Sequence, residues 1–138
     1  MTQVRPFLLA LVLIGAAGPL AAQDAMTSDE MGAQLYADNC AACHGMKGQG
    51  DGPLAEAFIQ DIPALTGLSA ANDGTFPLLK VIQILDGRTE VRGHGGPMPV
   101  FGALFRNELE PLVGRFGTEA VIRGRVLAIA EHVATLQE

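Results

Sequence analysis

Two cysteines three positions apart, followed at once by a histidine, constrain this chain more than any other feature. Residues 40–44 read Cys-Ala-Ala-Cys-His. On a helical turn, thiols three positions apart face the same way, and the adjacent histidine is carried beside them. The thiols can then add to the two vinyl groups along one porphyrin edge, while the imidazole reaches the iron. The spacing therefore predicts covalent haem c, held by Cys40 and Cys43, with His44 as one axial ligand.

Other uses of two cysteines fit this spacing less well. In a secreted protein two cysteines would suggest one disulfide, but a disulfide does not explain the adjoining histidine. A thioredoxin-like redox site expects a βαβ context, and the sequence has no strand-like alternation around the motif. A zinc site needs four ligands, and His94 and His132 are too scattered along the chain to complete one.

Met98 is the candidate for the second axial ligand. It lies in Gly95-Gly96-Pro97-Met98-Pro99, where the flanking prolines favour an extended, stiff segment and the glycines allow close approach to a haem. His94, four residues earlier, is the rival, and an open iron site is the third possibility. A His/Met pair saturates the iron and raises its reduction potential, which suits electron transfer. We therefore expect a carrier that is not an enzyme and has no small-molecule substrate.

The N-terminus reads as a secretory signal. A single positive charge, Arg5, precedes an apolar run over residues 7–22, which is shorter than the roughly 20 residues that span a bilayer. We expect a cleavable signal peptide over residues 1–22 and one domain over residues 23–138, exported to the periplasm. If this segment were retained, it would be the chain's membrane contact.

The charge of the expected mature chain limits its partners. Removing residues 1–22 takes away one of nine basic residues and none of the fifteen acidic ones, which leaves a net charge of −7. Nucleic acid is excluded, because its affinity depends on lysine and arginine meeting phosphates. We expect redox partner proteins with basic docking surfaces; the alternative is that the charge only keeps the domain soluble.

Helical patterns occupy most of the remaining chain. Thr27 and Glu30 can form a capping box for a helix that runs to about Asn39, and Gly32 and Tyr36 share one face of it, where another helix would cross. A short helix is expected over 54–60, and a helix over 76–85, closed by Asp86-Gly87, carries Phe76, Leu79, Ile82 and Leu85 at three-residue steps on its apolar face. Residues 101–116 are expected to form a connector with room for a short helix. A last helix, capped by Thr118, has an apolar stripe of Ile122, Val126, Ile129, Val133 and Leu136.

Taken together, these features resemble the class I c-type cytochromes over essentially the whole mature chain. Gly32 and Tyr36 look like the family's helix contact pair, residues 40–45 its attachment site, and residues 98–102 its methionine loop. The resemblance implies a small all-α, orthogonal helical fold around one covalent haem. It also implies that the carbonyl of Pro53 accepts the other ring proton of His44.

The chain also departs from that family. His132 stands where an aromatic residue is usual, and no tryptophan is present for a haem propionate, so Arg88 or Arg92 is a candidate in its place. The family's ring of docking lysines is reduced to Lys47 and Lys80.

Three roles follow from the sequence. The first is a soluble carrier. The second is a subunit of a larger redox complex, which an exposed patch of Phe101, Leu104 and Phe105 would favour. The third is a haem enzyme or sensor with an open iron site. In each role we expect the chain without haem to be largely unfolded or molten, because the core of a domain this size is modest.

Overall fold

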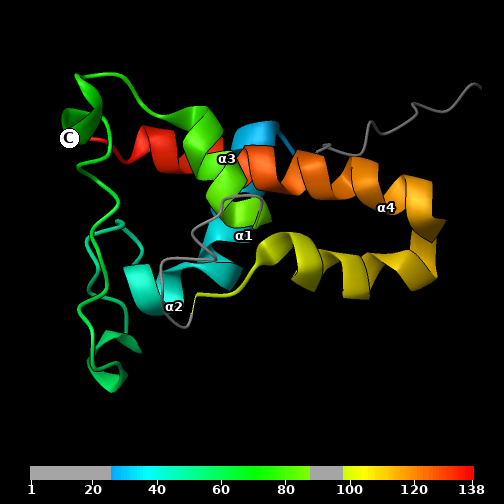
Figure 1. The fold of residues 1–138 in the computed structure, drawn as a ribbon, viewed down its shortest axis with the longest axis horizontal. Helices are drawn as coiled ribbons and strands as arrows, with labels where there is room; N and C mark the ends of the chain where they lie inside the picture. Colours follow the sequence, from blue (N-terminus) through cyan, green and yellow to red (C-terminus); the bar gives the residue numbers. More distant parts are fainter. Residues whose placement is uncertain (1–25, 88–97) are drawn as a thin grey trace, which may run out of the picture.

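The computed structural model describes residues 26–87 and 98–138. Within these ranges the chain forms helices and no strands, so the expected all-α fold is confirmed. Figure 1 shows the elements in order: α1 (Ser28–Asn39), α2 (Ala41–His44), the 3₁₀ helices η1 (Ala55–Ala57) and η2 (Ala70–Asn72), α3 (Leu78–Asp86) and α4 (Phe101–Thr135). No helix in these ranges is long and apolar enough to cross a membrane. The predicted signal peptide, Arg88, Arg92 and His94 lie outside the described residues.

The first helix begins where its capping box predicts. The backbone N–H of Glu30 donates to Thr27 Oγ1 at 3.2 Å, and the backbone N–H of Thr27 donates to Glu30 Oε2 at 2.8 Å. These bonds satisfy donors that an uncapped helix would leave unpaired. At the other end, the N–H of Cys40 donates to the Tyr36 carbonyl at 2.8 Å, so α1 leads directly into the cysteine motif.

The predicted crossing of α1 with the C-terminal helix is confirmed. Gly32 is buried against α4, where a Cβ atom would collide with the carbonyl oxygen of Ala128. One turn later, the ring of Tyr36 lies 5.0 Å from that of His132, centroid to centroid. The two helices therefore approach closely because Gly32 has no side chain.

The third helix ends as predicted but begins later. Gly87 has a φ of 75° and closes α3 in the left-handed conformation that glycine favours. The helix begins at Leu78 rather than Phe76, because a residue that precedes a proline, here Pro77, is disfavoured in helical conformation. Leu79, which was expected on the apolar face, is 68% exposed.

The largest departure from expectation is α4. A connector with at most a short helix was predicted over 101–116, but the segment is helical up to Gly114. There α4 bends back on itself, with φ and ψ of 67° and 170° at Gly114. The result is a hairpin, with a first arm over 101–113 and a second arm over 115–135. Thr118 does not cap a new helix: its hydroxyl donates to the Gly114 carbonyl at 2.7 Å from inside the second arm.

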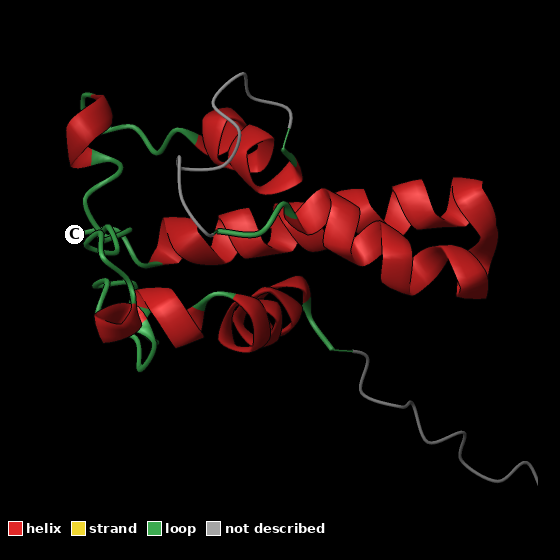
Figure 2. Ribbon diagram, turned by 60° about the horizontal axis from the view of Figure 1, so that its bottom comes forward, coloured by secondary structure: helices red, strands yellow, loops and turns green. Residues whose placement is uncertain are grey.

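The two arms of the hairpin hold each other by packing and by charge. Figure 2 shows them side by side, extending away from the other helices. Arg125 of the second arm pairs with Glu108 of the first at 3.0 Å, and its guanidinium lies 5.1 Å from the ring centre of Phe105. Arg106 and Glu119 make a second ion pair between the arms at 3.3 Å.

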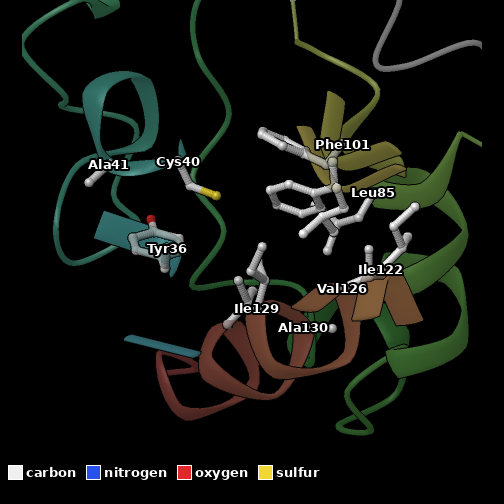
Figure 3. Packing of buried hydrophobic residues seen from close by; sticks show 12 residues of the cluster. Tyr36, Cys40, Ala41, Leu85, Phe101, Ile122, Val126, Ile129 and Ala130 are labelled. Carbon is white, nitrogen blue, oxygen red and sulfur yellow. The ribbon is translucent and has the colours of Figure 1, made fainter. Parts of the chain in front are cut away.

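The core lies where α1, α3 and the base of the hairpin meet. The predicted stripe of the last helix is confirmed, since Ile122, Val126, Ile129 and Val133 are buried and Leu136 packs against them. Figure 3 shows Tyr36 and Cys40 on one side of this region, and Phe101 and Leu85 on the other.

Candidate haem site

The motif Cys40–His44 forms a single helical turn at the wall of a cavity. The N–H of His44 donates to the Cys40 carbonyl at 2.9 Å, which sets the pitch of this turn. Cys40, Cys43 and His44 all line the same cavity, and the two cysteines are free thiols. The turn therefore presents both sulfur atoms and the imidazole to one space, as their spacing predicts.

Glycines allow the chain to wrap tightly beneath this turn. A Cβ atom on Gly52 would lie 2.6 Å from the Cys43 carbonyl carbon, so only glycine fits against the backbone of α2. Gly50 has a φ of 80°, and its N–H donates to the His44 carbonyl at 2.8 Å. The hydroxyl of Tyr36 donates to the Gly45 carbonyl at 2.8 Å and ties the wrap to α1.

The orientation of His44 is set by a carbonyl from a later loop. Its Nδ1 atom lies 3.1 Å from the carbonyl oxygen of Pro63. A contact of this kind fixes the ring orientation of a histidine whose Nε2 atom binds a metal. The expectation that Pro53 supplies this carbonyl was therefore wrong. Pro53 is exposed in the turn before η1, where the neighbouring backbone of Gly52 and Leu54 is bonded to α2.

The cavity beside His44 has a volume of about 520 Å³, within the range of sites for cofactor-sized ligands. Residues 57–63 form one wall of it, and Met98, Pro99 and Phe101 line it together with the cysteine motif. A second cavity of about 170 Å³ continues between α1, α3 and α4 and shares Cys40, His44 and Met98 with the first. Both are mainly apolar, so size, lining and donor set fit a covalently attached porphyrin.

Met98 lies at the entrance to α4. It is half-buried, and it is the one methionine that lines either cavity among the described residues. The chain after it is fixed against α3: Val100 contacts Gly87, and a Cβ atom on Gly102 would lie 2.9 Å from the Asp86 carbonyl oxygen. The structure thus brings Met98 into the same space as His44.

Comparison with models of protein families identifies the family of proteins to which this site belongs. The family model described as Cytochrome c matches residues 30–113, which is more than half of the chain. The chain belongs to the cytochrome c family. This agrees with the class I resemblance of its motifs, and it assigns to the protein a covalently attached haem c with iron and a role in electron transfer. Searches of curated proteins and of solved structures found no match.

Burial changes the acid–base state of two residues at this cytochrome c site. Burial, with a smaller contribution from neighbouring Cys43, raises the pKa of the Cys40 thiol to about 12. Burial, with smaller contributions from Cys40 and Asp51, likewise raises the pKa of Tyr36 to about 12, so its hydroxyl remains a hydrogen-bond donor to Gly45.

Sequence reasoning missed several residues of this cytochrome c site. Phe101 lines the cavity and is 2% exposed, as is Phe105, so these residues do not form with Leu104 the exposed patch that would have favoured a complex subunit. The spacing of Phe101, Phe105 and Leu109 was a helical signal that could have located the first arm. The wall over 57–63 and the Pro63 carbonyl carried no comparable signal.

Proposed function

We propose that this cytochrome c is an exported single-haem carrier in which Cys40 and Cys43 form the thioethers and His44 and Met98 are the axial ligands. The observation that carries the proposal is that these four residues, and no other methionine or histidine of the described ranges, line the one cavity of about 520 Å³. Export follows from the signal-like residues 1–22.

Each residue of the site has a part in electron transfer. The Pro63 carbonyl holds the His44 ring in one orientation, and the fixed segment after Met98 limits the movement of the thioether. The apolar cavity wall excludes water and lowers the reorganisation that accompanies a change of charge. When bound, haem supplies an iron that cycles between ferric and ferrous states. A methionine ligand raises the potential of that couple.

The charge of the haem-binding part supports a basic redox partner. Residues 26–87 carry eight acidic and two basic side chains, a net charge of −6. Complementary charge steers the encounter of two proteins and aligns them before contact. The role of a permanent complex subunit loses its main support, because Phe101 and Phe105 are buried.

Replacement of Met98 tests the proposal. In haem-loaded protein, Met98→Ala should abolish the low-spin methionine-ligated spectrum, lower the potential by on the order of 100 mV, and allow carbon monoxide to bind the reduced iron. Met46→Ala is the matched control, because Met46 is 66% exposed and lines neither cavity. An unchanged spectrum in Met98→Ala would reject this ligand. Carbon monoxide binding to the unaltered protein would instead favour an enzyme or sensor.

A further inference from the structure

The first turn of α3 places a cation, Lys80, at the second cavity. Lys80 and Pro77, the residue before α3, both line this cavity of about 170 Å³. Among the described residues, Lys80 is the one lysine or arginine that lines either cavity. Within residues 26–87 and 98–138, no ion pair joins it to an acid. Lys80 is therefore available to an anionic group that enters the cavity.

The position of Lys80 in its helix favours an anion nearby. It is the third residue of α3, and a positive charge in the first turn of a helix opposes the helix dipole. No side chain caps this end of α3 with a hydrogen bond. A carboxylate near the turn would interact favourably both with the Lys80 ammonium group and with the positive end of the helix.

Haem carries two carboxylates, and the thioethers decide which way they point. Its two propionates are attached at the porphyrin edge opposite the two vinyl groups. Cys40 and Cys43, which would bind the vinyl edge, both line the first cavity, whereas Cys40 alone lines the second. The propionate edge would then point away from the motif. Figures 1 and 2 both show η2 and the start of α3 on the opposite side of this part of the molecule from α2.

The charges that line the two cavities agree with this direction. Asp61 lines the first cavity, and its carboxylate would repel a propionate there. In the second cavity, the hydroxyl of Tyr36 and the side-chain amide of Asn72 each donate to a backbone carbonyl. Lys80 is thus the residue of the second cavity that offers a positive charge to a carboxylate.

We propose that the ammonium group of Lys80 pairs with a haem propionate and so holds the porphyrin edge opposite the thioethers. The proposal rests on the proposed attachment of haem through Cys40 and Cys43. Lys80 is exposed, so its long side chain can lie along the cavity wall with the charge in water at the rim. An opposite charge within about 4–6 Å favours the ionised form of a carboxyl group, so the pair would lower the pKa of the propionate. Lys80 is then a positioning residue for the haem.

The experiment compares two lysine substitutions in the haem-loaded protein. Lys80→Ala removes the cation from the second cavity. Lys47→Ala is the matched control, because Lys47 carries the same charge, is exposed and lines neither cavity. Resonance Raman spectroscopy records the bending vibration of the propionates, which responds to their hydrogen bonds. Redox titration at a series of pH values records where the reduction potential begins to rise.

Protonation of a propionate removes a negative charge beside the iron, so the reduction potential rises as the pH falls through the pKa of the propionate. Lys80→Ala should shift the propionate band and move this rise to higher pH by about one unit. Lys47→Ala should do neither. Lys80→Arg, which keeps the charge, should leave the rise near its original pH.

An unchanged propionate band and pH profile in Lys80→Ala would overturn the proposal. Equal changes in Lys47→Ala would also overturn it, since they would reflect net charge rather than a contact with the propionate. The absorption spectrum of the unaltered protein separates this result from the proposed function. Haem without thioether bonds would overturn both proposals, whereas a normal low-spin spectrum with an unchanged propionate band in Lys80→Ala would overturn the role of Lys80 alone.

Discussion

At the scale of single residues, the crossing of α1 and α4 depends on the missing side chain of Gly32. Gly32→Ala would place a Cβ atom against the Ala128 carbonyl, and we expect it to lower the free energy of unfolding by about 1–3 kcal/mol. Gly124→Ala is the matched control on α4, because nothing lies within 4 Å of its Cβ position. It should raise stability by about 0.5–1 kcal/mol. Urea denaturation of the haem-loaded protein measures both, and changes of the same sign would contradict the account.

His132, which packs on Tyr36 where α1 and α4 cross, makes the stability of the fold depend on pH. Burial against α1 lowers the pKa of His132 below 6.5, so the folded protein favours the neutral ring that packs on Tyr36. The unfolded chain therefore binds the proton first, and the contribution of His132 is complete above pH 6.5 and is lost as the pH falls below it. We expect thermal melting temperatures of the haem-loaded protein to fall over this range, and His132→Phe to fall less. Equal slopes would show that His132 plays no part.

Residue-level prediction from sequence succeeded where the signal was local. The capping box of Thr27 and Glu30, the close approach at Gly32 and the helix end at Gly87 each involve residue types whose chemistry limits where they occur. The partner of His44 was not predictable in this way. Every residue offers a carbonyl, so only the path of the chain through residues 45–63 brings Pro63 rather than Pro53 to the ring.

At the scale of elements, the hairpin of α4 joins two segments that were predicted as separate, a connector over 101–116 and a last helix after Thr118, and each arm has its own role. The first arm begins at the haem cavity with Phe101, and the second arm packs on α1. Gly102, Pro111 and Gly114 obscured the first arm, because glycine and proline usually interrupt helices. The apolar residues Phe101, Phe105 and Leu109 are buried only because the second arm folds back against the first, and this tertiary packing cannot be read from local sequence.

Ion pairing between the arms should matter only where it is partly shielded from water. Arg125→Ala removes both the bond to Glu108 and the contact with the Phe105 ring, and we expect a loss of about 1 kcal/mol in unfolding free energy. Arg115→Ala, whose side chain is 82% exposed and 4.0 Å from Glu110, should have no measurable effect. Denaturant titration of the two variants compares them directly. A larger loss for Arg115→Ala would contradict this assignment.

At the scale of the whole molecule, the haem is expected to complete the core. The cavities of about 520 and 170 Å³ lie between α1, α2, α3 and the base of α4, and their walls are mainly apolar. Without a porphyrin these walls face water or collapse. We expect the double variant Cys40→Ala, Cys43→Ala, prepared without haem, to retain part of its helical circular dichroism but to lose cooperative melting. A sharp, near-native transition would contradict this.

The bend at Gly114 also has a consequence for how relatives of this protein could vary. Leu112, Val113 and Phe116 beside this bend are exposed and do not line the haem cavity. Exposed turns are the places where chains best tolerate insertion and deletion. Equal lengths could be added to or removed from the two arms while Phe101 and Ile129 kept their places at the base. Family matching ends at residue 113, directly before this turn. The hairpin is thus the part of the molecule where evolution could change chain length, and with it the reach of the protein, at little cost to the redox centre.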